Sequence, residues 1–253
     1  MVDERTPATI TAGRLVVRLL TMNTTNHLSL RLATTLLLVG QILYIVITQF
    51  HTGGDANNHQ AIFAAYAASD AWTAVHVGQF AAMAVLLGGL LVLALAVDAQ
   101  NAAAWWAGRL GAASAVAALA LYGGLQAVDG IANKQADLAW VNAAKSEQMA
   151  RFASAEVIRW IEWGLRSYHD YALGLALLLV GFAIMRFAWT SSLLGALVAL
   201  SGLIYLVQGW LVGVEGFSAS VSIAIVAAWA VSVVWMIWLA ITVRRLPASL
   251  STS

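Results

Sequence analysis

The sequence contains no cysteine, only two prolines and few charged residues, and each shortage excludes a kind of protein or site. Without cysteine there can be no disulfide, no thiolate metal site and no cysteine nucleophile. Charged residues make up 10% of the 253 residues and hydrophobic residues 61%, whereas about a quarter of a soluble domain is charged. The formal net charge of +1 provides no basic surface for nucleic acid. A soluble domain, a disordered chain and a nucleic-acid-binding protein are excluded, and an integral membrane protein remains.

Long apolar runs fill most of the chain, and a helix needs about 20 such residues to cross a bilayer. Both prolines, Pro7 and Pro247, lie outside these runs, so no run is interrupted by proline. Lipid offers no hydrogen-bond partners to the backbone, so runs this long must be helical. We predict an all-α polytopic membrane bundle of six transmembrane helices, at residues 29–50, 71–97, 106–128, 168–188, 191–213 and 218–243.

The basic residues predict an orientation, because cytoplasmic loops of membrane proteins are enriched in Lys and Arg. Two loops on one side, 51–70 and 214–217, contain neither residue. We therefore expect both termini to be cytoplasmic, in a multi-pass protein of the bacterial inner (plasma) membrane. The basic residues assigned to the cytoplasmic side are Arg5, Arg14, Arg18, Arg31, Arg109, Arg186, Arg244 and Arg245.

The chain divides into three parts by composition. Residues 1–27 form a basic, partly disordered lead-in, residues 28–245 the transmembrane domain, and residues 246–253 a tail. Within the domain, residues 129–167 form a long outer connection that we expect to be helical. Met22 opens a segment typical of a natural start, so the residues before it either precede the true start or belong to the lead-in.

Polar side chains gather in the outer halves of the predicted helices, whereas the inner halves are almost purely apolar. Residues spaced by three or four share one face of a helix, and a polar side chain in lipid is costly unless it faces protein or water. We therefore expect a polar pocket in the outer half of the bundle. Its candidate residues on these helices are His76 and Gln79, Gln126 and Asp129, Tyr205 and Gln208, and Glu215 just beyond the fifth span.

The fourth span carries most of the charge. Residues 152–181 are predicted as one continuous helix in which the charged residues lie on one arc and alternate in sign at spacings of three or four, so that they can form ion pairs. The residues of this arc are Glu156, Arg159, Glu162, Arg166, His169 and Asp170, of which the last four are candidates for the pocket.

Three functional hypotheses fit this pattern. In the first, the pocket binds or translocates a small molecule or an ion, with His76 and His169 as groups that titrate near neutral pH. In the second, the chain is a structural or accessory subunit, or a homo-oligomer, that packs through glycine and alanine faces. In the third, His76 and His169 hold haem or a divalent metal in a redox or enzyme module. No catalytic residue is predicted, since neither GxSxG nor HExxH occurs.

Each candidate also has a purely structural interpretation. Gln, Ser and Tyr side chains commonly form hydrogen bonds between membrane helices, and the charged arc of the fourth span could be a solvated surface of weak ion pairs. His76 could be a buried histidine bonded to a neighbouring helix. His51 and His59, in the first outer loop, are expected to face solvent.

Two segments, at residues 53–80 and 127–184, resemble uncharacterised bacterial multi-span membrane proteins. No activity is attached to that group, so the resemblance implies architecture alone. Both segments coincide with the predicted outer pocket.

Overall fold

The computed structural model describes residues 24–97, 101–187 and 190–246, and all regular secondary structure in these ranges is helical. Six helices are long and apolar enough to cross a membrane, which confirms the predicted all-α fold and its number of spans. Met22, most of the predicted lead-in and nearly all of the tail lie outside the described residues. The six helices are α2 (Thr24–Thr48), α4 (Trp72–Ala96), α5 (Ala102–Ala127), α7 (Gln148–Met185), α8 (Ser192–Glu215) and α9 (Ala219–Arg244).

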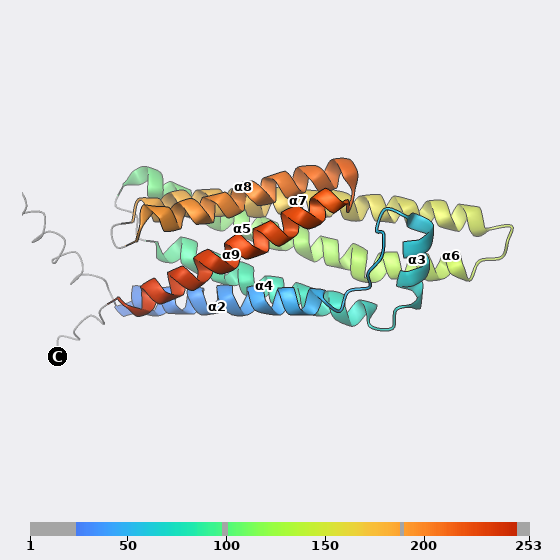
Figure 1. The fold of residues 1–253 in the computed structure, drawn as a ribbon, viewed down its shortest axis with the longest axis horizontal. Helices are drawn as coiled ribbons and strands as arrows, with labels where there is room; N and C mark the ends of the chain where they lie inside the picture. The colour runs from blue at the N-terminus through green and yellow to red at the C-terminus, as the bar shows by residue number, and fades with distance from the viewer. Residues whose placement is uncertain (1–23, 98–100, 188–189, 247–253) are drawn as a thin grey trace, which may run out of the picture.

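The long helices lie side by side along one axis, and two short helices lie at one end of the bundle, one across it and one as the continuation of α5 (Figure 1). These are α3 (His59–Ala68) and α6 (Lys134–Val141), and we call this end of the bundle the α3 end. Helix α9 crosses the bundle obliquely, near α2 at the opposite end and away from it toward the α3 end (Figure 1). The α3 end is the side that the sequence predicts to be outer.

Helices α7 and α8 pack closely through facing glycines. A Cβ atom added at Gly174 would lie 2.7 Å from the carbonyl oxygen of Gly202, and one added at Gly181 would lie 2.7 Å from that of Gly195. Only glycine permits two helix backbones to approach this closely. The tight contact fixes the rotation of α7, and with it the direction in which the charged arc faces.

A large apolar core runs along the six helices, and a smaller aromatic core lies at the α3 end. The smaller core contains Phe63 and Tyr66 of α3, Trp72 of α4 and Trp140 of α6. The rings of Tyr66 and Trp72 are 3.9 Å apart between centroids. This cluster attaches α3 and α6 to the transmembrane helices and so builds a rigid cover over the end of the bundle.

Polar contacts hold both ends of α3 in place. The ammonium group of Lys134 donates to the carbonyl oxygens of Tyr66, Ala67 and Ser69, each at 2.8 Å, and so satisfies the last turn of α3. Asn57 donates to the carbonyl oxygen of Glu215 at 2.8 Å, which joins the loop before α3 to the end of α8. The loop before α3 and the last turn of α3 are therefore both anchored to neighbouring parts of the bundle.

Candidate metal centre

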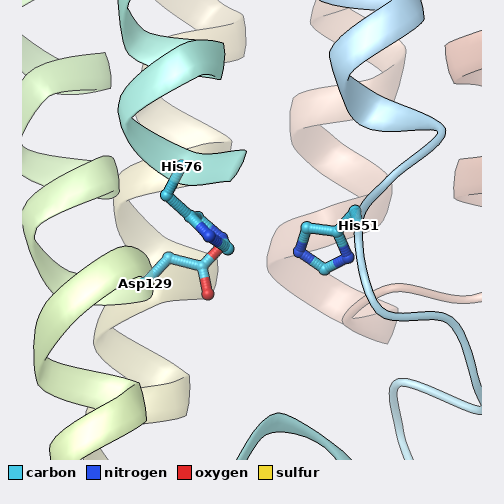
Figure 2. A group of neighbouring side chains, drawn as sticks. All are labelled: His51, His76 and Asp129. Atoms are coloured by element: carbon cyan, nitrogen blue, oxygen red, sulfur yellow. The ribbon is translucent and has the colours of Figure 1, made fainter. Parts of the chain in front are cut away.

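Three potential metal ligands from separate parts of the chain meet at the α3 end. His51 lies in the loop after α2, His76 in the second turn of α4, and Asp129 in a π-helical turn, η1 (Val128–Asn133), that continues α5. One ligand atom from each residue lies within 4.8 Å of the other two. Figure 2 shows His76 and Asp129 directed at each other, with the His51 ring facing them from across the gap.

The π-helical turn places Asp129 opposite α4. Such turns insert an extra residue into a helix, free backbone groups and are frequent at functional sites. Here side chains of α4 bond the carbonyls of the turn: the Trp72 indole N–H donates to Asp129 at 2.8 Å, and the Thr73 hydroxyl to Gly130 at 3.3 Å. A Cβ atom at Gly130 would lie 2.6 Å from the Cβ of His76, so glycine is needed for α4 to come this close.

Both histidines use the same ring nitrogen to contact the backbone. Nδ1 of His76 lies 2.7 Å from the carbonyl oxygen of Trp72, and Nδ1 of His51 lies 3.0 Å from that of Thr52. A carbonyl can only accept, so each Nδ1 carries a proton, and in the neutral form of each histidine Nε2 keeps the lone pair that a metal needs. Metal-binding histidines are almost always oriented in this way, by donation of the second ring N–H to a carbonyl or a carboxylate.

The Nε2 atom of His76 is buried and has no hydrogen-bond partner of acceptable geometry among the described residues. It nevertheless lies 3.0 Å from Oδ2 of Asp129. Burial lowers the pKa of the His51 imidazole, an effect that the Asp129 carboxylate only partly offsets, and this favours the neutral form of the ring. The Nε2 atoms of both histidines and the Asp129 carboxylate thus converge on one point (Figure 2).

A network of buried charges surrounds this point. The Asn133 amide donates to both Asp129, at 3.2 Å, and Glu162, at 2.6 Å, and Arg159 lies 2.5 Å from the same oxygen of Glu162. Asp137 is also buried nearby, and one of its oxygens has no partner among the described residues. Three buried carboxyl groups therefore lie at this end, and Arg159 contacts one of them, while the Lys134 ammonium is taken up by backbone carbonyls at the end of α3. Buried charges require partners, and a bound cation would supply one.

A cavity of about 270 Å³ opens beside the three residues and includes His51 and Asp129 in its lining. Two of its side chains, Tyr122 and Gln126, have a buried oxygen without a hydrogen-bond partner among the described residues. Buried polar atoms are normally paired, so these oxygens point to a ligand or water in the cavity. Apolar residues complete the wall, including Leu125, Ile225 and Trp229.

The structure brings six of the predicted site residues together. Five of them line the cavity, and His76 lies against Asp129. The charged arc of α7 also occurs as predicted, within one uninterrupted helix, and its ion pairs are buried rather than solvated. The predicted residues that line the cavity are Gln79, Gln126, Asp129, Glu162 and Arg166.

The other predicted residues lie elsewhere. His169 contacts the carbonyl oxygen of Ala118 at 2.9 Å, eleven residues before Asp129 on α5 and therefore about 16 Å deeper. His76 and His169 thus do not meet at one metal or haem site. Asp170 pairs with Arg166 and Gln208 below the cavity.

Two further predicted residues also lie apart from the three ligands. Tyr205 lines a much smaller second pocket between the helices. Glu215 is exposed and accepts a hydrogen bond from Ser218 at 2.7 Å. The predicted set therefore divides between the cavity, the helix interior and the surface.

Sequence reasoning missed His51 as a ligand and assigned it to solvent, whereas the structure half-buries it beside His76. A signal was present, since His51 continues the polar face of α2 that Tyr44 and Thr48 begin, at spacings of four and three. His59, the neighbouring histidine of the same end, instead pairs with Glu156 at 3.0 Å.

Comparison with protein families, with curated proteins and with solved structures finds no match for this chain. The apolar helices show a multi-pass membrane protein in a lipid bilayer environment. A homo-oligomer or a partner in a membrane complex stays a prediction. The proposed function therefore rests on the geometry of the three ligands and of the cavity beside them.

Proposed function

We propose that this integral membrane protein binds one divalent transition-metal ion through His51, His76 and Asp129. The observation that supports this is the common orientation of the histidines, each with Nδ1 on a carbonyl and Nε2 toward the carboxylate. Two imidazoles and one carboxylate suit zinc and ferrous iron. Three protein ligands leave a coordination position open, as in sites where the metal meets a small molecule.

The position of the ligands agrees with such a centre. Ligands about 2.0–2.2 Å from a tetrahedral zinc ion lie about 3.4 Å apart. The pair His76–Asp129 is already at 3.0 Å, and all three ligand atoms lie within 4.8 Å of one another. A small rotation of His51, which belongs to a loop and not to a helix, completes the centre. The open position then faces the cavity, where the predicted small molecule or ion would bind.

A buried ion pair between His76 and Asp129 is the competing interpretation. It would account for their 3.0 Å contact but requires nothing of His51. A metal, by contrast, requires all three residues. His51 therefore distinguishes the two interpretations, and its place in a loop allows it to be changed without altering a membrane helix.

The test is a titration of the purified protein in detergent with Zn²⁺ and with Co²⁺, which reports its coordination in the visible spectrum. We expect one ion per chain. Loss of a residue that only supports a metal ligand typically weakens binding about 10–100-fold. We expect a larger loss of affinity when a ligand itself is removed, in His51→Ala, His76→Ala and Asp129→Asn. His59→Ala is the matched control, because it removes a histidine of the same end that lies outside the three ligands, and it should bind as the unchanged protein does.

Two results would overturn the proposal. One is the absence of stoichiometric binding in the folded, monodisperse protein. The other is unchanged affinity in His51→Ala, which would leave only a His76–Asp129 ion pair.

We also propose that the α3 end faces outward from a bacterial inner membrane, with both termini cytoplasmic. Arg109, Arg186 and Arg244 lie near helix ends opposite to it, which agrees with the rule that basic residues stay inside. Because the chain has no cysteine, single cysteines can be introduced directly. Asn142→Cys at the α3 end should react with an impermeant maleimide on intact cells and Ser192→Cys should not; the reverse pattern contradicts the orientation.

A further inference from the structure

The cavity lies where two membrane helices separate. Helices α2 and α9 are close at the end opposite α3 and diverge toward it (Figure 1). Tyr44 and Thr48 of α2 and Ile225 and Trp229 of α9 line the cavity. Tyr44 and Trp229 are the lining residues farthest from the α3 end on their helices, and their rings meet edge to face at 5.9 Å. The two rings therefore close the cavity at its deep end, between α2 and α9.

The outer surfaces of these two helices are apolar and unpacked beside the cavity. On α2, Val46 is 50% exposed, and on α9, Ile223 is 71% and Val226 is 62% exposed. In a bilayer these side chains contact lipid. The space between α2 and α9 is thus bordered by lipid on the side that faces away from the bundle.

The opposite wall of the same cavity is polar. Asp129 and Glu162 lie there, His51 faces Asp129 from across the gap (Figure 2), and the open coordination position of the proposed metal would face this space. One side of the cavity therefore suits an oxygen donor that binds a cation, and the other suits hydrocarbon. A fully water-soluble ligand would leave the apolar side of the cavity without a hydrocarbon contact.

We propose that the cavity takes a membrane amphiphile with one hydrocarbon chain, whose oxygen-donor headgroup coordinates the metal while the chain extends between α2 and α9 into lipid. This inference rests on the proposed metal centre. A volume of about 270 Å³ is just below the range of about 300–1,000 Å³ that is usual for ligand pockets, which suits a headgroup and the first part of a chain, with the rest of the chain outside. The divalent ion provides the charge complementarity for an anionic or strongly polar oxygen donor.

The test compares a short and a long hydroxamate, since this headgroup binds divalent metals through two oxygens. The Co²⁺-loaded protein in detergent is titrated with acetohydroxamate and with octanohydroxamate, and the visible Co²⁺ spectrum is recorded. We expect both to shift the spectrum, the long-chain compound at a total concentration at least tenfold lower. Partition into micelles contributes to this advantage, so a variant must separate that contribution from binding between the helices.

Ile225→Trp is that variant, because it fills the α9 wall of the cavity. It should keep Co²⁺ and acetohydroxamate binding, which shows that it is folded, and lose most of the long-chain advantage. Ile223→Trp adds the same ring on the lipid-facing side of the same helix and should keep that advantage. If Ile225→Trp loses Co²⁺ binding, Ile225→Phe replaces it as the smaller change.

The possible failures are distinct. A protein that does not bind Co²⁺ refutes the metal centre itself. A protein that binds Co²⁺ but shows equal affinity for both hydroxamates has a water-soluble ligand instead. A long-chain advantage that persists in Ile225→Trp shows that the chain does not lie between α2 and α9. Either of the last two results overturns the amphiphile proposal and leaves the metal centre intact.

Discussion

The ion pair between Arg166 and Asp170 makes a quantitative test of the buried charges in α7. The Asp170 side chain is fully buried, accepts from Nε of Arg166 at 3.1 Å and accepts from the amide of Gln208 on α8 at 2.7 Å. Arg166 also reaches the Tyr44 hydroxyl at 3.3 Å. These contacts join α7 to α8 and α2 at the deep end of the cavity, where Tyr44 and Arg166 are part of its lining.

Removal of one partner is costly because it leaves the other charge buried and unpaired. Arg166→Met keeps much of the side-chain volume but strands the Asp170 carboxylate, which should reduce the free energy of unfolding by about 3–5 kcal/mol. Gln208→Leu removes one hydrogen bond to a charged group, which should cost about 1.5–3 kcal/mol. The double variant Arg166→Met/Asp170→Leu removes both charges, and since buried ion pairs contribute little relative to apolar replacements, it should recover most of the loss.

The measurement is reversible unfolding of the purified protein in mixed micelles, followed by near-ultraviolet circular dichroism of its tryptophans. The ion pair of Glu147 and Arg151 serves as the control, because it has the same spacing but lies at 3.6 Å with both side chains more than half exposed. Arg151→Met should change stability by less than about 1 kcal/mol, as exposed pairs do. The reasoning is refuted if Arg166→Met costs no more than this control, or if the double variant is as unstable as Arg166→Met alone.

Two further predictions concern close packing and ligand support. Gly202→Ala should reduce the unfolding free energy by about 1–3 kcal/mol, because its Cβ would lie 2.6 Å from the Gly174 carbonyl oxygen. The control is Gly88→Ala, whose Cβ would have no neighbour within 4 Å and which should leave stability unchanged or raise it. Equal losses of unfolding free energy for the two variants in micelles would contradict the packing argument. Trp72→Phe keeps an aromatic side chain but loses the indole hydrogen bond to the Asp129 carbonyl, so Co²⁺ titration should show affinity about tenfold lower. Unchanged affinity would mean that this bond does not support the ligand.

The helices were predictable because the length of an apolar run is a local property. The predicted span at 71–97 corresponds to α4, Trp72–Ala96, within a residue at each end. The largest differences are at 106–128 and 168–188, where the structure extends the helical segments to Ala102–Val141 and Gln148–Met185. The polar residues beyond the apolar runs do not end these helices, because they are paired inside the protein.

The candidate site was predictable only in part. Spacing placed Asp129 and Glu162 on inward faces of their helices, and the structure joins them through Asn133. The same reasoning grouped His169 with His76, although His169 bonds α5 near Ala118. Periodicity gives the face of a helix on which a residue lies, but not the depth at which neighbouring helices align.

By itself the sequence determined a membrane protein with six helices and with its polar side chains concentrated toward one end, because composition and run length suffice for these properties. The tertiary structure alone decided that His51, His76 and Asp129 meet. Their meeting depends on the π-helical turn that redirects Asp129, on the close approach of α4 at Gly130, and on the path of the loop after α2. These are contacts between distant segments, and no periodicity within a single helix encodes them.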